Sequence, residues 1–297
     1  MSMEFVRATS VAEARTVLAT EGARARVLAG GTDLLVNLRR RRVEVGTLVA
    51  VGHLPELVLL EREGGEVRIG AAVTHRMIEA SHLFRGPLRA LPEACATVGS
   101  IQIRNVGTLA GNVCNASPAA DTPPVLLAFD ARVVVAGSGG DRTLPLEAFF
   151  TGYRSTALDR GDLLREIRFP LPPRGSGSAF EKLGRRKAME ISVACVAAMV
   201  SLEDDGRTLQ SVRIGLGSVS ATSVRARGAE SALAGKEATA ETLRAAGELA
   251  SQEIAPIDDL RAGAGYRRSV VAALVARAVA RAADRAKLDL GSEDEDV

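Results

Sequence analysis

The most distinctive part of this chain is Gln102-Ile103-Arg104-Asn105-Val106-Gly107-Thr108-Leu109-Ala110-Gly111-Asn112-Val113-Cys114-Asn115-Ala116-Ser117-Pro118-Ala119-Ala120-Asp121. It is rich in glycine, asparagine and small residues, and it shows no clean helical or strand period. A loop this long inside a compact domain is usually functional or disordered. The interleaved valine, isoleucine and leucine residues argue against disorder, so we expect an ordered functional loop over 98–122.

A second stretch, Val27-Leu28-Ala29-Gly30-Gly31-Thr32-Asp33-Leu34, places two glycines between an apolar strand and the start of a helix. Glycine permits positive φ and close approach of backbone, and free N–H groups at a helix start favour an anion such as a diphosphate. Alone, this pattern is more typical of an ordinary strand-to-helix turn. Together with the donors of Gly107 to Asn112, it predicts two loops that wrap one diphosphate from both sides.

Composition and charge exclude several classes of protein. The chain has 297 residues, which suggests about two domains. Its 38 basic and 36 acidic residues nearly cancel, so the overall basic charge typical of nucleic-acid binding is absent. No apolar run approaches the ~20 residues of a membrane span, and the N-terminus lacks the apolar core of a signal peptide. We therefore expect a cytoplasmic protein with no nucleic-acid partner.

The cysteines and histidines do not predict a metal centre. The three cysteines, Cys95, Cys114 and Cys195, include no C-x-x-C pair, so the chain lacks the ligands for an iron–sulfur cluster or a zinc ribbon. The three histidines have no tight metal-ligand spacing. We expect reduced, mostly buried thiols and no metal site.

Hydrophobic patterns and breaker residues predict alternating helices and strands. Ser10 and Glu13 have the spacing of a capping box, and Gly22 ends that helix. Further helices are expected after Asp33 and at 74–81, 87–96, 123–128, 223–233, 240–254 and 265–287, and strands at 26–29, 47–51, 66–72, 131–136, 163–169, 179–183, 193–202 and 211–216.

The clearest linker is Pro170 to Gly177, with three prolines and two glycines in eight residues. It divides the chain into parts 1–174 and 175–288, and residues 289–297 are expected to form a frayed acidic tail. Familiar nucleotide motifs are missing: there is no P-loop, and Gly215 to Ser220 has serine where a dinucleotide fingerprint needs its third glycine.

The two small-residue stretches resemble those of the FAD-binding (medium) subunits of molybdenum hydroxylases, the family of xanthine dehydrogenase and carbon monoxide dehydrogenase flavoproteins. The resemblance covers roughly 3 to 285, and the stretch 102–121 is its most specific part. It implies an α+β fold: an FAD-binding domain of two α+β lobes over 1–174, of the vanillyl-alcohol oxidase superfamily type, and a smaller α+β flavoprotein domain over 175–288.

The resemblance also implies a cofactor site, with no catalytic residue on this chain. The loops matching Val27 to Leu34 and Thr108 to Asn112 hold the FAD diphosphate in the family. Asp121 matches an FAD-contacting aspartate, Leu164 an apolar adenine contact and Lys182 a lysine near the flavin. The expected cofactor contacts are therefore Val27, Leu28, Ala29, Gly30, Gly31, Thr32, Asp33, Leu34, Gly99, Thr108, Leu109, Ala110, Gly111, Asn112, Asn115, Asp121, Leu164 and Lys182.

The implied partners are a small subunit with [2Fe-2S] clusters and a large molybdopterin subunit, assembled as a dimer of heterotrimers. Electrons would pass from the clusters to FAD and then to NAD, a quinone, dioxygen or another acceptor. Two alternatives stay open. One is a stand-alone FAD-dependent oxidoreductase. The other is a non-catalytic assembly subunit that has lost FAD, suggested only by Ala110 at a position where many relatives have glycine and where positive φ would strain alanine.

Overall fold

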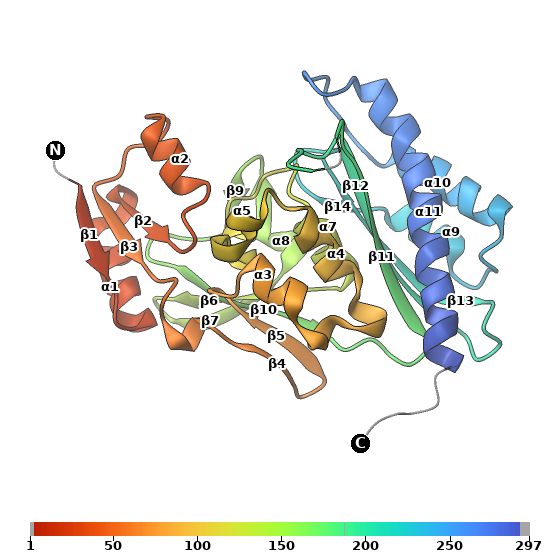
Figure 1. Cartoon of the computed structure of the whole chain (residues 1–297), viewed down its shortest axis with the longest axis horizontal. Coiled ribbons are helices and arrows are strands. Elements are labelled where there is room, and N and C mark those ends of the chain that lie inside the picture. The colour runs from red at the N-terminus through yellow and green to blue at the C-terminus, as the bar shows by residue number, and fades with distance from the viewer. Residues whose placement is uncertain (1–2, 187, 292–297) are drawn as a thin grey trace.

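The first lobe alternates strand and helix, and its three strands form a parallel sheet in the order β1-β3-β2 (Figure 1). A computed structural model describes residues 3–186 and 188–291. The Ser10 hydroxyl accepts a hydrogen bond from the backbone N–H of Glu13, which is one half of the predicted capping box. The Glu13 carboxylate accepts from the Thr9 N–H at 2.7 Å and not from that of Ser10. The elements are β1 (Glu4–Arg7), α1 (Val11–Glu21), η1 (Gly22–Arg24), β2 (Ala25–Leu28), α2 (Leu34–Arg39) and β3 (Thr47–Ala50).

The second lobe is an antiparallel sheet with strand order β4-β5-β10-β6-β7, and the short helices α3, α4, α5 and α7 are seen above it in Figure 1. Its strands are β4 (Leu60–Glu63), β5 (Glu66–Gly70), β6 (Arg132–Gly137), β7 (Gly140–Pro145) and β10 (Leu163–Pro170). Its other elements are η2 (Pro55–Leu57), α3 (His75–Ala80), η3 (His82–Phe84), η4 (Gly86–Leu88), α4 (Ala90–Thr97), α5 (Ile101–Val106), α6 (Leu109–Cys114), α7 (Thr122–Ala128), α8 (Leu146–Phe149) and the hairpin β8 (Phe150–Gly152) and β9 (Ser155–Thr156).

The C-terminal part is an antiparallel sheet, β11-β12-β13-β14, whose outer face is covered by the long helix α11 (Figure 1). Helix α10 packs on α11, and α9 packs on β13. No helix in the two described ranges is long and apolar enough to cross a membrane. The elements are β11 (Ser176–Leu183), β12 (Ala194–Leu202), β13 (Leu209–Gly217), β14 (Val224–Arg225), α9 (Arg227–Leu233), α10 (Ala240–Gln252) and α11 (Ala264–Gly291).

Strand β12 lies between the hydrophobic cores of the two parts of the chain, and both of its faces are buried. Cys195, Ala197 and Met199 belong to the core of the first two lobes. The alternate residues Val196 and Ala198 belong to the core that the sheet shares with α10 and α11. Side chains alternate across a strand, so a continuous apolar run is what a strand between two cores requires.

The glycines at the end of β13 serve packing rather than nucleotide binding. A Cβ atom on Gly215 would lie 1.9 Å from the carbonyl oxygen of Pro124, and one on Gly217 would lie 2.6 Å from the Cys195 sulfur. Helix α7 therefore approaches the C-terminal sheet at a distance that only glycine allows. This contact explains the partial glycine motif of the sequence.

The structure corrects several predicted elements. The stretch 98–122 is not a continuous loop: it contains α5 and α6, whose first turns are capped by the hydroxyls of Ser100 and Thr108. Each of these helices has six residues, too few for a helical period to appear in the sequence.

Other corrections concern boundaries. Residues 224–225 form a strand that pairs with β13, so α9 begins at Arg227 and not at 223. Strands occupy both ends of the predicted linker, which leaves 171–175 between them. Helix α11 continues through Gly291, so residues 289–291 are not a frayed tail, and 292–297 lie outside the described residues. Strands β1, β4, β7, β8 and β9 and helix α8 were not predicted.

Candidate cofactor site

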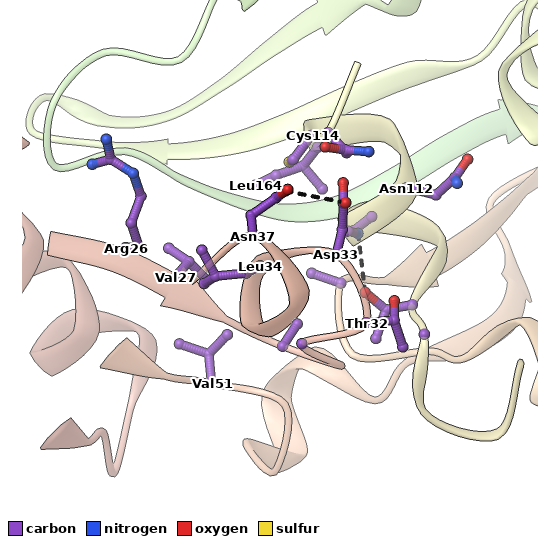
Figure 2. A pocket seen from close by; sticks show the side chains of 18 of the residues that line it. Arg26, Val27, Thr32, Asp33, Leu34, Asn37, Val51, Asn112, Cys114 and Leu164 are labelled. Carbon is purple, nitrogen blue, oxygen red and sulfur yellow. Dashed lines mark hydrogen bonds between the residues drawn. The ribbon is translucent and has the colours of Figure 1, made fainter. Parts of the chain in front are cut away.

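A cavity of about 530 Å³ lies where the loop after β2 meets α6 and the start of the long strand β10 (Figure 2). This volume is within the usual range of small-molecule sites, roughly 300–1,000 Å³. The residues that line it are Arg26, Val27, Ala29, Gly31, Thr32, Asp33, Leu34, Asn37, Val43, Val51, Ala71, His75, Val98, Ile103, Gly107, Thr108, Ala110, Gly111, Asn112, Cys114, Asn115, Arg154, Leu158, Asp162, Leu163 and Leu164.

The two adjacent glycines after β2 have different tasks. A Cβ atom on Gly30 would lie 2.0 Å from the carbonyl oxygen of Val106, so only glycine lets this loop approach the end of α5. Gly31 has a φ of 70°, in the left-handed region that other residues enter at a cost. Together they turn the chain from β2 into α2 and place it against the second stretch.

The first loop offers backbone donors. Within the described part of the chain, the N–H groups of Gly30, Gly31, Thr32 and Asp33 donate no hydrogen bond, and three of these four residues line the cavity. Consecutive N–H groups without internal partners form an anion-binding arrangement. This arrangement fits the predicted diphosphate contact.

The second segment, Thr108 to Asn112, forms the cap and first turn of α6. The Thr108 hydroxyl accepts from the Gly111 N–H at 3.0 Å, which orders the first turn of α6. The Asn112 side-chain oxygen accepts from the Thr122 hydroxyl at 2.8 Å. That bond orients the Asn112 amide, whose N–H₂ group remains as a donor at the cavity wall.

Ala110 causes no backbone strain. It lies inside α6 with negative φ and is buried, while its neighbours Gly111 and Asn112 line the cavity with it. Alanine at position 110, where many relatives have glycine, therefore does not strain the backbone and is no sign of a lost cofactor site.

A cationic side chain links the two loops. Arg154, in the turn between β8 and β9, donates to the Asn115 side-chain oxygen at 3.1 Å and lies 3.7 Å from the Asp33 carboxylate. Asp33 also accepts a hydrogen bond from the Asn37 amide at 3.2 Å, drawn as a dashed line in Figure 2. The guanidinium thus partly neutralises the carboxylate at a wall expected to meet a dianion.

Apolar side chains line another part of the cavity. Leu164, predicted as an adenine contact, lines it together with Leu158 and Leu163 from the second lobe and Val27 and Leu34 from the first. Figure 2 shows Leu164 across the cavity from the side chains of Val27 and Leu34. A polar region beside an apolar one is the usual composition of a nucleotide-sized site.

Asp121 and Lys182 lie together but outside the lining of this cavity. The Lys182 Nζ is 2.6 Å from the Asp121 carboxylate, which also accepts from the hydroxyls of Thr97 and Ser192. Burial raises the pKa of Asp121, and the nearby ammonium opposes that rise. Asp121 makes no capping bond to α7, so it is not a local helix cap.

Four predicted contacts line a second cavity of about 380 Å³: Leu28, Ala29, Gly30 and Thr108. Of these, Ala29 and Thr108 also line the main cavity. Leu109 is fully buried, and Gly99 has a φ of 51° in the turn before α5. Neither lines either cavity.

The structure adds cavity residues that the sequence did not reveal. Arg26, Asn37, Arg154 and His75 are polar, and none of them belongs to either of the two stretches that the sequence singled out. Ile103 and Gly107 lie inside the stretch 102–121, and this position in the sequence could have marked them as cavity residues.

Comparison with known proteins identifies the family. Residues 1–172 match the family model "FAD binding domain in molybdopterin dehydrogenase", and residues 178–282 match "CO dehydrogenase flavoprotein C-terminal domain". The chain is 33% identical over 276 residues to the carbon monoxide dehydrogenase medium chain of Hydrogenophaga pseudoflava, covering 93% of this chain and 95% of that one. It is 31% identical over 280 residues to the putative xanthine dehydrogenase FAD-binding subunit of Escherichia coli K12, covering 94% and 95%.

A solved structure agrees with these relatives. A chain of carbon monoxide dehydrogenase from Hydrogenophaga pseudoflava, in a form lacking the Mo-pyranopterin moiety, superposes with a TM-score of 0.92 at 34% identity, covering 96% of this chain and 98% of that one. The predicted α+β fold, with an FAD-binding domain and a C-terminal domain, is thereby confirmed. The relatives are subunits of oxidoreductase complexes, and the cavity fits the cofactor that the family model names. The chain belongs to the FAD-binding subunits of the molybdenum hydroxylase family.

Proposed function

We propose that this chain is an electron-transfer subunit, holding an FAD that takes electrons from [2Fe-2S] clusters of a partner subunit and passes them to an external acceptor. The observation that carries the proposal is the cavity between the two loops, where unpartnered N–H groups, glycine-dependent close approach and an apolar wall occur together. The relatives support it, because they are medium or FAD-binding subunits of dehydrogenases.

The residues of this chain bind and orient the cofactor. The N–H groups of Gly31 to Asp33 and the amide of Asn112 hold the diphosphate, because backbone dipoles stabilise a dianion without adding mobile charge. Leu164 and its apolar neighbours take the adenine. FAD, when bound, supplies the redox group of the subunit.

Asp121 and Lys182 act at the boundary between the second lobe and the C-terminal sheet. Lys182 comes from β11 and Asp121 from the residue before α7, and their side chains are nearly buried. We assign this pair to the flavin end of the cofactor. The Lys182 ammonium there would favour extra negative charge on a nearby flavin and raise its reduction potential, and the Asp121 carboxylate paired with it would reduce this effect.

We propose further that the functional division follows 1–174 and 175–288, and that the chain works in the cytoplasm. It assembles with an iron–sulfur subunit and a molybdopterin subunit as a dimer of heterotrimers. The substrate is then oxidised on the molybdopterin subunit, and no residue of this chain acts on it as an acid or base.

Rapid mixing tests the proposal. The full chain loaded with FAD is mixed anaerobically with its iron–sulfur partner, which has been reduced with dithionite and freed of excess reductant. The proposal predicts bleaching of the flavin absorbance together with reoxidation of the clusters. A flavin that stays oxidised in a stable complex with the reduced partner would refute electron transfer while leaving FAD binding intact. Copurification with both partner chains would further separate this function from a stand-alone oxidoreductase.

A further inference from the structure

His75 is a buried side chain whose polar atoms have no partner within the described residues. Only 2% of the residue is exposed, yet it lines the main cavity. Its Nδ1 is buried without a hydrogen bond, and Nε2 makes none to any residue in the described ranges. Leaving a buried polar group unpaired costs stability, so an unpaired imidazole at a cavity wall calls for a ligand.

The backbone holds this imidazole in place beside the two loops. His75 is the first residue of α3, and its N–H donates to the carbonyl of Gly107 at 3.0 Å. The preceding Thr74 bridges to Thr108, the cap of α6. A Cβ atom on Gly107 would lie 3.6 Å from Cδ2 of His75 and 3.4 Å from the Thr32 hydroxyl. The ring therefore stands next to Gly107, which itself lies against Thr32 of the first loop.

The environment keeps the ring neutral in the absence of a ligand. Burial and, to a lesser extent, the nearby Arg104 guanidinium lower the pKa of His75 to about 4, while Glu79 opposes them. Arg104 is paired with Glu79 at 3.2 Å. A neutral imidazole has one N–H donor and one acceptor nitrogen, so it can donate a hydrogen bond to an oxyanion without carrying a charge.

We propose that His75 is a cofactor-binding residue, donating a ring N–H to an oxygen of the FAD diphosphate. This inference rests on the proposed FAD site and deepens it. It implies that a ring nitrogen of His75 that has no partner among the described residues gains one when the cofactor binds. FAD binding then requires a ring N–H at position 75, whereas the stability of the cofactor-free chain favours an apolar side chain there.

Titration of the FAD-free full chain with FAD tests the inference. His75→Met removes the ring nitrogens at similar volume and is expected to weaken binding about tenfold or more, since hydrogen bonds to charged groups are the strong ones. His75→Gln retains an amide donor and should stay within about threefold of the wild type. The matched controls are His82→Met and His82→Gln, because His82 is exposed and lines neither cavity.

Thermal unfolding separates a binding role from a structural one. The FAD-free His75→Met chain is expected to be at least as stable as the wild type, because the substitution removes an unsatisfied polar group. The added stabilisation that FAD gives the wild type should be reduced in this variant. A structural role predicts the opposite order, with a lower melting temperature in the FAD-free variant.

Nitrogen-15 spectra of histidine give a readout that needs no destabilising variant. The chain has three histidines, and the His75→Gln spectrum identifies the signals of His75. Adding FAD to the wild type should shift a ring-nitrogen signal of His75 and leave those of His82 in place. Unchanged His75 signals with FAD bound, or equal affinity of His75→Met, would overturn the inference. A wild-type chain that binds no FAD would instead refute the proposed site itself.

Discussion

Gly30 and Val106, 76 positions apart in the chain, meet so closely that a Cβ atom on residue 30 would lie 2.0 Å from the Val106 carbonyl oxygen. This contact joins the first lobe to the end of α5 and forms one edge of both cavities, because Gly30 lines one and its neighbour Gly31 the other. The cofactor site therefore depends on a packing contact between two backbones.

Gly30→Ala should separate the two loops and weaken FAD binding strongly. The clash is with backbone and cannot be relieved by a side-chain rotation, so we expect a loss of about 1–3 kcal/mol in stability as well. Melting temperature and FAD titration measure both effects. Gly139→Ala is the control, because a Cβ atom there meets nothing within 4 Å. Equal FAD affinity for Gly30→Ala and the wild type would contradict the assigned role of this contact.

Arg154 is expected to aid FAD binding by compensating the charge of Asp33. Arg154→Gln leaves the Asp33 carboxylate uncompensated beside the diphosphate, so affinity should fall several-fold and the fall should be larger at low salt. Asp33→Asn in the same chain should restore most of the affinity. Isothermal titration of the four chains forms a double-mutant cycle. Additive effects would show that the two side chains act independently. Arg160→Gln, at an exposed residue outside the cavity, serves as control.

Lys182→Met should destabilise the FAD-free chain by about 3 kcal/mol, because it leaves the buried Asp121 carboxylate without its cation. Asp121→Asn added to this variant should recover much of the loss. Denaturant unfolding provides the free energies. Lys287→Met is a matched control, since Lys287 and its partner Asp284 are both exposed and should contribute little. A loss confined to the control, or equal in both, would contradict the burial argument.

The Lys182→Met deficit should depend on pH in a defined direction. Burial raises the pKa of Asp121 in the folded state above its unfolded value, and removing the ammonium raises it further. Such a group penalises folding when it is ionised, and the penalty disappears as pH falls towards the unfolded pKa. The deficit should therefore be smaller at about pH 5 than at about pH 8. A deficit that grows on acidification would contradict this sign.

Cys114 should react slowly with iodoacetamide although it lines the cavity. Burial raises its pKa to about 12, so the reactive thiolate is rare at neutral pH. Mass spectrometry of the native and the guanidinium-unfolded chain compares the rates, with unfolding expected to accelerate labelling at all three cysteines. FAD should slow labelling of native Cys114 further. Rapid labelling of Cys114 that FAD does not affect would place it outside the cofactor cavity.

Local patterns allowed much of the fold to be predicted. Ser10 with Glu13 marked the start of α1, and the apolar run of β12 marked a strand that two cores bury from opposite faces. Predictions failed where an element is short or polar. Strand β7 carries charged and exposed residues because it lies at the edge of its sheet, and α5 and α6 each complete less than two turns.

Sequence patterns predicted the candidate site only at positions where the backbone conformation or a close backbone contact requires glycine. Gly30 and Gly31 were visible because backbone contact and positive φ demand glycine. His75 and Arg154 were not, since a single histidine or arginine gives no local signal and its position depends on the tertiary fold. The pairing of Asp121 with Lys182 depends on how the second lobe meets the C-terminal sheet, which no local pattern encodes.

The central claim is that the cavity between the two loops holds FAD for electron transfer, and FAD content tests it most directly. The full chain, purified with its partner subunits, is analysed by visible absorption, acid release and quantification of the pigment, before and after incubation with FAD. We predict released FAD equimolar with the chain after incubation, and its loss in Gly30→Ala. A wild-type complex that carries no FAD and takes up none would contradict the account.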